Sequence, residues 1–438
     1  MQRRYFLSKS GILLAASSPL AWADDDKKKG KKTYGNATGS PALAPTPTAA
    51  SGVKSRVIVI GGGMAGATVA KYLRLWGNNI GVTLIERESS YVSNIMSSLV
   101  LSGQRTMASL TYNYSKLVSA YGVTVIKSDV QEIDTVGVKV KLADGTILAA
   151  DRIVIAPGID FDEVKGLGAS DRMPHAWKAG MQTTLLANQL KAMTDGGTFA
   201  LTIPKAPYRC PPGPYERACL VADWLKKNKP RSKVIVLDAN PVIQAEKLVF
   251  EAAFKMHNID YIPNAEVNSV DPAKMSLDTT MGPQLGLGVV NLIPPQKAGS
   301  LIAKAELNNS ADGRFATVKH LTYESTKAPK IHIIGDASDT TQPKAGHIAN
   351  QEAKVCADAI VRALAGLPPD PAPVTNSACY STITMSQASW LTAVYQYDTA
   401  TSKMKVGGAG VAASETWDSE NFKEMNTWFN ALMADSFA

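Results

Sequence analysis

The side chains best suited to chemistry in this 438-residue chain are its four cysteines, Cys210, Cys219, Cys356 and Cys379. The first two enclose the segment RCPPGPYERAC, which also carries Glu216. Two thiols that can close into a disulfide exchange two electrons, and a carboxyl group beside them can move protons. Glu216 could instead act only as a negative charge at the start of a helix predicted over 214–227. The chemistry therefore depends on the elements that position these residues.

The first folded segment, SRVIVIGGGMAGATVAKYLRLWGNNIGVTLIERE, is a complete βαβ unit. We predict a strand over 56–60, a helix that ends near Trp76, and a second strand over 82–85. The intervening turn has the G-x-G-x-x-G spacing, supplied by Gly61, Gly63 and Gly66. These glycines permit a tight turn, close approach of a pyrophosphate, and close packing of helix on strand. We therefore predict a dinucleotide-binding site.

One acidic and one basic side chain stand at the end of the second strand, where the adenosine of a bound dinucleotide is expected. Glu86 lies 20 residues after Gly66 at the end of the second strand, where a carboxylate accepts hydrogen bonds from ribose hydroxyls. Arg87 follows it directly and is expected to contact the same part of the cofactor.

Two later segments indicate FAD rather than NAD. The segment ADRIVIAPGIDF is a buried strand that ends in Ala156, Pro157 and Gly158, where FAD-binding domains join a second domain. The segment PKIHIIGDASD is another buried strand, and it ends in Gly335 and Asp336. In flavoproteins with two dinucleotide-binding domains, such an aspartate holds the ribityl chain. The order of these segments resembles the FAD fold of glutathione reductase.

The segment between them repeats the βαβ pattern with an altered first turn. GTFALTIP is a predicted strand, a helix covers 214–227, and SKVIVLDAN is a strand that ends at Asp238. The turn reads PKAPYRCPPG where a nicotinamide-binding domain has glycines. Proline has no N–H to offer a phosphate, and Tyr208 and Arg209 obstruct its approach. We therefore do not expect NAD(P)H as reductant, and Cys210 occupies the vacated position.

Cys356 lies on a predicted helix 20 residues after Asp336 and is expected to point toward the flavin, with Cys210 approaching from the facing domain. A disulfide between them would close a loop of about 146 residues and stabilise the fold by a few kcal/mol. A plain structural disulfide, or two unpaired buried thiols, remains an alternative. Cys219 and Cys379 either pair with each other or stay as small buried residues, and the second reading is favoured.

From about Ser55 onward the sequence resembles the flavoprotein subunit of flavocytochrome c sulfide dehydrogenase, a relative of the sulfide:quinone oxidoreductases. The likeness rests on YRCPPGPYERA, on PKAGHIANQEAKVCA and on TWFNALMADSFA. It implies a Cys210–Cys356 disulfide over FAD, with Glu216 in the same pocket. It also implies that hydrosulfide attacks this disulfide, leaving a persulfide and a thiolate, and that electrons pass through FAD to a c-type cytochrome.

Two positions qualify this resemblance. The family commonly attaches FAD to a cysteine, but the matching segment YVSNIMSSLVLSG has Asn94 at that place, so FAD is expected to be bound without a covalent link. Lys344 could place a positive charge beside the flavin, or it could be an ordinary surface lysine.

The N-terminus is predicted to direct export. Arg3 and Arg4 precede a short apolar stretch that ends in AWA, which is typical of a twin-arginine signal peptide over 1–23. The stretch is too short to be a transmembrane segment. Residues 24–52, rich in charge, proline and threonine, are predicted to be a disordered linker. We therefore expect a periplasmic protein.

The fold class predicted is α/β: two Rossmann-like domains of glutathione-reductase type and a small C-terminal α+β domain. The FAD-binding domain is assigned to 53–161 and 286–370, the second domain to 162–285, and the C-terminal domain to 371–438. The last domain should end in an amphipathic helix with an apolar face made by Phe422, Met425, Phe429, Leu432 and Met433. That face is expected to pack on the protein or on a cytochrome subunit.

Composition excludes some functions and leaves others open. Apolar residues make up 45% and charged residues 19%, as in ordinary globular proteins. The net charge of +8 falls to +5 without the first 23 residues, and no basic patch interleaved with aromatics predicts nucleic-acid binding. No C-x-x-C-H haem motif is present, so haem would come from a partner. Two alternatives stay open: quinone as electron acceptor, and an accessory thiol-redox flavoprotein that acts on a sulfur-carrier protein.

Overall fold

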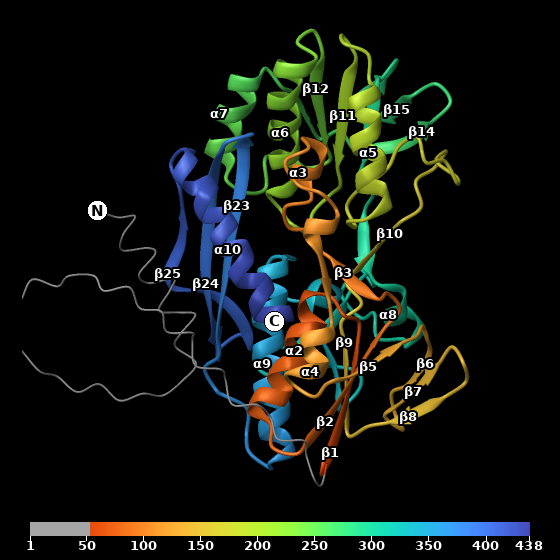
Figure 1. Cartoon of the computed structure of the whole chain (residues 1–438), viewed down its shortest axis with the longest axis vertical. Helices are drawn as coiled ribbons and strands as arrows, with labels where there is room; N and C mark the ends of the chain where they lie inside the picture. The colour runs from red at the N-terminus through yellow and green to blue at the C-terminus, as the bar shows by residue number, and fades with distance from the viewer. Residues whose placement is uncertain (1–52) are drawn as a thin grey trace, which may run out of the picture. The chain divides into compact units, whose positions relative to one another are not determined.

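The computed structural model describes residues 53–438 (Figure 1), so the predicted signal peptide and linker lie outside the described residues. The FAD-binding part is built on an eight-stranded sheet in the order β22-β19-β20-β21-β9-β1-β2-β5. In chain order its strands are β1 (Ser55–Ile60), β2 (Ile80–Glu86), β5 (Thr124–Lys127), β9 (Arg152–Ile155), β19 (Ala316–Lys319), β20 (Glu324–Ser325), β21 (Ile331–Ile333) and β22 (Ser338–Asp339).

The centre of this sheet is parallel and buried. β1 pairs in parallel with β2 and β9, and β9 pairs in parallel with β21. The valine and isoleucine runs of these strands are buried on both faces, as a parallel sheet covered by helices requires. Helices α2 (Met64–Trp76) and α9 (Gly346–Leu364) pack against each other on it. α2 starts just after β1, and α9 starts after the 3-10 turn and short strand that follow β21. Residues at the N-termini of both helices line one cavity.

The second domain has a four-stranded parallel sheet in the order β13-β12-β11-β17. Its strands are β11 (Thr198–Ile203), β12 (Lys233–Asp238), β13 (Asp260–Pro263) and β17 (Val289–Leu292), and its helices are α5 (Met181–Ala192), α6 (Gly213–Asn228) and α7 (Lys247–His257). β17 pairs with β11, although the sequence placed residues beyond 285 in the FAD-binding domain. The second domain thus continues through Leu292, because β17 completes its sheet.

The C-terminal part is an antiparallel meander of β23 (Val374–Thr384), β24 (Gln387–Asp398) and β25 (Lys403–Ala413), followed by α10 (Ser419–Phe437). β23 contacts both α6 and α9, and α10 contacts α2 and β24 (Figure 1). On α10, Met425, Phe429, Leu432 and Met433 are buried and Phe422 is partly buried, so the predicted apolar face packs on the chain itself. The predicted fold class is confirmed.

Smaller elements connect these parts. The remaining strands are β3 (Ser90–Val92), β4 (Thr111–Asn113), β6 (Val130–Asp134), β7 (Lys139–Leu142), β8 (Ile147–Ala149), β10 (Ile159–Phe161), β14 (Val267–Asp271), β15 (Ser276–Thr279), β16 (Gly282–Gln284) and β18 (Gln296–Ala298). The short helices are α3 (Ser98–Leu101), α4 (Ser115–Ser119) and α8 (Ser300–Lys304), with 3-10 turns η1 (Ala108–Leu110) and η2 (Gly335–Ala337). β10 and β18 pair antiparallel and join the two large domains.

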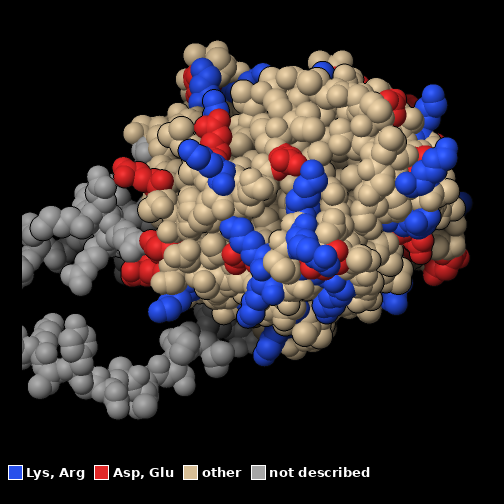
Figure 2. All heavy atoms as spheres, turned by 90° about the horizontal axis from the view of Figure 1, so that it is seen from above, with Lys and Arg blue, Asp and Glu red and all other residues tan. Residues whose placement is uncertain are grey.

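The end of the second domain carries mixed charge. Figure 2 shows lysine and arginine side chains gathered over one half of this face, with acidic side chains among them. In the loop between α6 and β12, Arg231 pairs with Asp195 at 2.9 Å, and at the start of β12 Lys233 pairs with Asp260 at 3.1 Å. Within residues 53–438, no helix is long and apolar enough to cross a bilayer.

Candidate active site

The turn between β1 and α2 has the shape that the glycine spacing predicts. Gly61 has a φ of +98°, and a Cβ there would lie 2.3 Å from the carbonyl oxygen of Ala156. A Cβ on Gly66 would lie 1.7 Å from the carbonyl oxygen of Gly61, so the helix can approach the strand only with glycine there. A Cβ on Gly63 would meet no atom within 4 Å. The turn therefore leaves open space at Gly63, in front of the N-terminus of α2, where a phosphate can be accommodated.

The residues at the end of β2 line the same cavity, whose volume is about 520 Å³. One carboxylate oxygen of Glu86 accepts a hydrogen bond from the Gly62 N–H at 2.5 Å, and the other accepts from the Glu88 N–H at 3.0 Å. Arg87 also lines the cavity, and its exposed side chain pairs with Asp129 at 3.5 Å. Glu86 thus ties the glycine turn to β2 at the place expected for the adenosine.

The two predicted strand ends meet on the opposite side of the turn. Ala156, Pro157 and Gly158 line the cavity, with Gly158 at a φ of +68°. Asp336 lines it as well, and its Oδ1 is buried without a hydrogen-bond partner among the described residues. Its Oδ2 lies 3.6 Å from Arg209 Nη1. A buried carboxylate oxygen that lacks a donor fits the hydroxyl groups of a ribityl chain, so these residues fit FAD.

Lys344 does not take the place predicted for its side chain. Its ammonium group donates to the carbonyl oxygens of Asp336 at 3.0 Å and Ser338 at 2.8 Å and lies 3.7 Å from the centre of the Phe315 ring. Burial lowers the pKa of this amine. The lysine and arginine residues that do line the cavity, among the described residues, are Arg87, Lys178, Arg209 and Arg217. The Lys344 backbone does contribute, because its carbonyl accepts a 2.7 Å hydrogen bond from the Cys210 N–H.

The other end of the cavity holds two cysteines and a carboxyl group. Cys210, just before α6, Cys379, on β23, and Glu216, on the first turn of α6, all line it. Cys210 has a φ of +59°, a left-handed conformation that is costly for a residue with a Cβ. This conformation turns the chain from β11 into α6, and the carbonyl of Cys210 accepts from the Gly213 N–H at 2.9 Å. The strand β23 brings Cys379 to the same place from the C-terminal domain.

The pairing of Cys210 with Cys356 is not what the structure shows. Cys356 is fully buried in the core of the FAD-binding domain, and it is not among the described residues that line the cavity. Gly346, His347 and Ala349, at the start of α9, do line it. Cys356 follows ten residues after the start of α9, which places it about 15 Å farther along the axis at 1.5 Å per residue. Cys219 is also fully buried, whereas Cys379, expected to pair with Cys219 or to stay as a small buried residue, lies at the site.

Burial controls the ionisation of the groups at this end. Glu216 Oε1 accepts from Thr382 Oγ1 at 2.7 Å, yet burial raises the pKa of the Glu216 carboxyl to about 7. Burial, with the nearby carboxylates of Glu246 and Glu216, raises the pKa of the Cys379 thiol to about 12. Burial also raises the pKa of the Cys210 thiol, with Cys379 and Glu216 adding to the effect and Arg209 opposing it. A thiol here needs a proton acceptor, and Glu216 is poised to be one near neutral pH.

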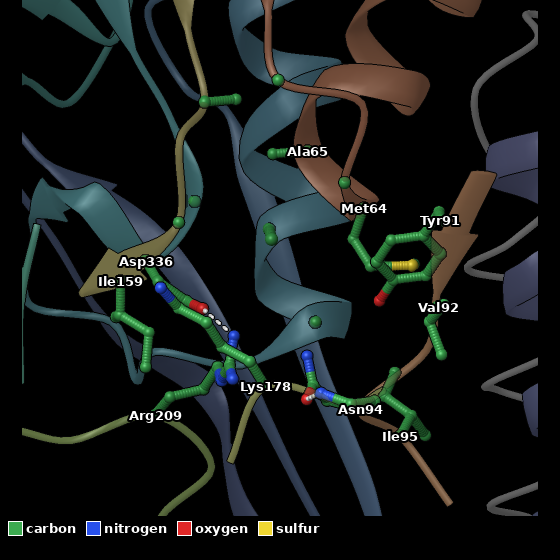
Figure 3. Close-up of a pocket in the computed structure, with 18 of the residues that line it drawn as sticks. Met64, Ala65, Tyr91, Val92, Asn94, Ile95, Ile159, Lys178, Arg209 and Asp336 are labelled. Atoms are coloured by element: carbon green, nitrogen blue, oxygen red, sulfur yellow. Dashed lines mark hydrogen bonds and ion pairs between the residues drawn. The ribbon is translucent and has the colours of Figure 1, made fainter. Parts of the chain in front are cut away.

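Asn94, at the position predicted to lack the attachment cysteine, connects two domains. Its side-chain oxygen accepts a 2.6 Å hydrogen bond from the Ala179 N–H. Figure 3 shows Asn94 beside Lys178, with Arg209 and Asp336 close by on the same side of the cavity. Asn94 therefore serves to hold the segment that carries Lys178 against the FAD-binding domain.

In the second domain, the acidic residue at the end of β12 is hydrogen-bonded to two tyrosines. Asp238 is fully buried, and its Oδ2 accepts from the hydroxyls of Tyr215 at 2.7 Å and Tyr261 at 2.9 Å. Its Oδ1 accepts from both the backbone and the side chain of Asn240. The carboxylate that would hold a nucleotide ribose has no free oxygen, in agreement with the proline-rich turn.

Sequence reasoning missed Cys379, Arg217 and Trp177 as cavity residues. Arg217 directly follows Glu216 in the PYER run, so the sequence did contain a pattern that could have indicated it. Cys379 and Trp177 carry no local signal, because only the placement of their segments against α6 brings them to the site.

The fold and the cavity define an FAD-dependent oxidoreductase of the pyridine nucleotide-disulphide oxidoreductase class, whose family model matches residues 55–188. Two further models match: the central part of the sulfide dehydrogenase (flavocytochrome c) flavoprotein chain over 183–294, and the flavocytochrome c sulphide dehydrogenase flavin-binding part over 371–437. The chain is therefore a flavoprotein that resembles flavocytochrome c sulfide dehydrogenase and sulfide:quinone oxidoreductase.

Individual relatives agree with this assignment. A sulfide dehydrogenase (flavocytochrome c) flavoprotein chain of Chlorobaculum thiosulfatiphilum is 47% identical over 45 residues, which are 10% of this chain and 94% of that sequence. The mitochondrial sulfide:quinone oxidoreductase of Dictyostelium discoideum is 22% identical over 72% of each chain. The crystal structure of the Aquifex aeolicus sulfide:quinone oxidoreductase superposes with a TM-score of 0.72, at 18% identity, over 87% of this chain and 91% of that one.

Proposed function

We propose that this protein oxidises sulfide through a redox-active Cys210–Cys379 pair and FAD. The observation that carries this proposal is that Cys210, Cys379 and Glu216 line one cavity with the FAD-binding turn. The names of the family models and relatives favour sulfide as the substrate. The hydrogen bonds that Asp238 already accepts in the second domain speak against NAD(P)H as the electron donor.

The chain's own residues provide the sulfur chemistry. In the oxidised form hydrosulfide attacks one sulfur of the Cys210–Cys379 disulfide, so that one S–S bond breaks and another forms. One cysteine becomes a persulfide and the other a thiolate. When bound, FAD would supply the two-electron acceptor. Loss of two electrons from the thiolate and the persulfide re-forms the Cys210–Cys379 bond, and the outer sulfur leaves at oxidation level zero as elemental sulfur or, on a further hydrosulfide, as polysulfide.

Oxidation of hydrosulfide also releases a proton, which must leave the cavity. Glu216 is the carboxyl group beside both cysteines, and its pKa of about 7 lets it accept a proton from the persulfide near neutral pH. Thr382 keeps the carboxyl oriented through its hydroxyl group. Asp336 would hold the ribityl side of the cofactor and Glu86 the adenosine side, and the N-terminus of α2 would bind its phosphates.

The acceptor and the location form the finer part of the proposal. A c-type cytochrome is the proposed acceptor, supported by the two flavocytochrome c family models. A periplasmic location is supported by the twin arginine and the AWA site in the sequence. FAD is proposed to be bound without a covalent link, since Asn94 replaces the attachment cysteine and bonds to the backbone of Ala179.

Anaerobic titration of the holoprotein with sulfide tests the sulfur chemistry. Cys379→Ser and Cys210→Ser should each slow flavin bleaching by at least about 10², the scale of losing a covalent nucleophilic step. Cys356→Ser is the matched control, because this thiol is buried elsewhere in the same part of the chain, and it should bleach like the wild type. Normal bleaching in Cys379→Ser would contradict the pairing.

Reoxidation of the bleached protein distinguishes the acceptors. We expect cytochrome c to restore the flavin absorbance faster than a soluble quinone does. Faster reoxidation by the quinone would favour a sulfide:quinone oxidoreductase, as the Dictyostelium relative is named. Bleaching only by a persulfidated carrier protein, and not by free sulfide, would favour an accessory thiol-redox role. Yellow colour that stays on acid-precipitated protein would contradict non-covalent binding.

A further inference from the structure

Arg217 is a buried positive charge with neutral partners. Its side chain is 2% exposed and belongs to α6, next to Glu216 in the sequence. Its Nε donates to Ser98 Oγ at 3.3 Å, and Nη1 donates to Asn291 Oδ1 at 2.9 Å. The guanidinium carbon lies 4.6 Å from the centre of the Trp177 ring. Among the described residues, no ion pair includes Arg217.

Burial of this charge costs desolvation free energy, which a negative charge in the cavity would offset. A buried guanidinium whose hydrogen bonds go only to neutral groups has lost its hydration and gained little in return. Burial lowers the pKa of Arg217 to about 10, with Glu216 and Cys210 opposing the shift, so the group stays cationic at neutral pH. Its fork has five N–H donors, and the two hydrogen bonds above leave donors to spare. The cation is thus held ready for a negative charge.

The cavity supplies that charge when it is reduced. Arg217 lines the cavity together with Cys210, Glu216 and Ser98. We propose that Arg217 is the counter-ion for the negative charge that the cavity gains on two-electron reduction, on the Cys210 sulfur and on the bound flavin. The sulfur half of this inference rests on the proposed function, whereas the flavin half needs only FAD in the cavity.

The other cations near the cavity are already committed. Arg209 lies 3.6 Å from Asp336 and donates to the Trp177 carbonyl. Lys178 is half exposed and pairs with Asp160 at 3.3 Å. The Lys344 ammonium is turned toward two backbone carbonyls. Arg217 alone among these combines burial, cavity exposure and neutral partners.

A purely structural role is the competing explanation. Arg217 joins Ser98 of α3, in the FAD-binding domain, to Asn291 of β17, in the second domain. As a mechanical link it would matter for stability, and the charge itself would be incidental. Methionine and lysine separate the two roles, because methionine keeps volume without charge and lysine keeps charge without the forked hydrogen bonds.

The experiment measures the flavin midpoint potential of the holoprotein by equilibration with a redox dye, together with sulfite affinity, and neither requires sulfide turnover. Arg217→Met should lower the equilibrium constant for two-electron reduction about tenfold or more, which is a fall in potential of about 30 mV or more. Sulfite, an anion that adds to oxidised flavins, should bind at least about tenfold more weakly. Arg217→Lys should retain most of both values.

Arg152→Met is the matched control, since Arg152 pairs with Glu324 at 3.6 Å and is not among the described residues that line the cavity. It should lose stability without a change in potential. If Arg217→Met loses stability but keeps the wild-type potential and sulfite affinity, Arg217 is a mechanical link and the proposal is overturned. If Arg217→Met fails to retain FAD, Arg217→Gln provides the same comparison.

The outcomes separate this inference from the proposed function. A fall in potential in Arg217→Met, combined with normal bleaching in Cys379→Ser, keeps the flavin half and removes the disulfide mechanism. An unchanged potential in Arg217→Met, combined with slow bleaching in Cys379→Ser, keeps the disulfide mechanism and removes the flavin half. For the sulfur half, the thiol of Cys210 in the Cys379→Ser background should alkylate at least about tenfold more slowly at pH 8 when Arg217 is methionine, because the thiolate has lost its counter-ion.

Discussion

At the scale of single residues, burial decides what each group at the cysteine end of the cavity can do. Glu216 would be a carboxylate at any physiological pH if it were exposed, with no protonated form to use. Burial raises its pKa to about 7, so the protonated and ionised forms are both populated near neutrality. The same burial keeps the thiols of Cys210 and Cys379 protonated until a base is near.

Glu216→Gln tests this role. Glutamine keeps the oxygen that accepts from Thr382, so orientation is preserved while the proton acceptor is lost. Only the carboxylate form accepts a proton, and it is populated above pH 7. The ratio of wild-type to variant bleaching rates should therefore rise as pH increases through about 7, reaching about 10² on the alkaline side. Stopped-flow bleaching at a series of pH values measures the ratio, which also cancels the titration of sulfide itself. A flat ratio would remove Glu216 from proton transfer.

At the scale of elements, the β1–α2 turn contains glycines with two different tasks. Gly66 is required by the protein itself, because a Cβ would meet the Gly61 carbonyl oxygen at 1.7 Å. Gly63 is not required by the protein, because a Cβ would meet no protein atom within 4 Å, and we expect glycine there to make room for the cofactor.

Alanine at the two positions should separate these tasks. Gly66→Ala should lower the melting temperature of the flavin-free protein, since backbone must move to admit the methyl group. Gly63→Ala should leave the flavin-free protein as stable as the wild type and weaken FAD retention by at least about tenfold, as close approach of the phosphates is lost. Calorimetry and the flavin-to-protein ratio after gel filtration measure both effects. Equal melting losses in the two variants would contradict the assignment.

The contrast between Cys356 and Cys379 shows how far the sequence could predict this protein. The βαβ units, the cofactor turn and the strand that ends at Asp336 are local patterns, and each can be read within about 30 residues. The pairing of cysteines is not local. Cys356 had the right distance from Asp336 in sequence, but the axial rise of α9 carries it away from the cavity. Cys379 reaches Cys210 only because β23 packs on both α6 and α9, which no periodicity encodes.

At the scale of the whole molecule, one buried carboxylate fastens the second domain to the C-terminal sheet. Glu246, directly before α7, accepts from Ser381 Oγ and Ser389 Oγ, each at 2.6 Å. The two serines are directly opposite each other on β23 and β24, and both are fully buried. Ser381 is two residues from Cys379, so the same contact fixes the strand that carries the second cysteine.

Removal of both hydroxyls should loosen this connection. In Ser381→Ala/Ser389→Ala the Glu246 carboxylate would stay buried without donors, which costs about 1–3 kcal/mol or more for a charged group. We expect a lower melting temperature and slower bleaching by sulfide. Thr392→Val is the control, because it removes a partly buried hydroxyl of β24 that donates to the Ser377 carbonyl and leaves Glu246 untouched. A loss in the control as large as in the double variant would show that hydroxyl removal alone accounts for the effect.

The tyrosines around Asp238 have a consequence for how the protein is insulated. Tyr215 and Tyr261 donate hydrogen bonds to Asp238, the carboxylate that would otherwise hold a nucleotide ribose. A nucleotide would have to break both hydrogen bonds to bind there. Because both oxygens of Asp238 already accept hydrogen bonds, we expect NAD(P)H not to reduce the flavin, which leaves the sulfur side as the proposed route for electrons.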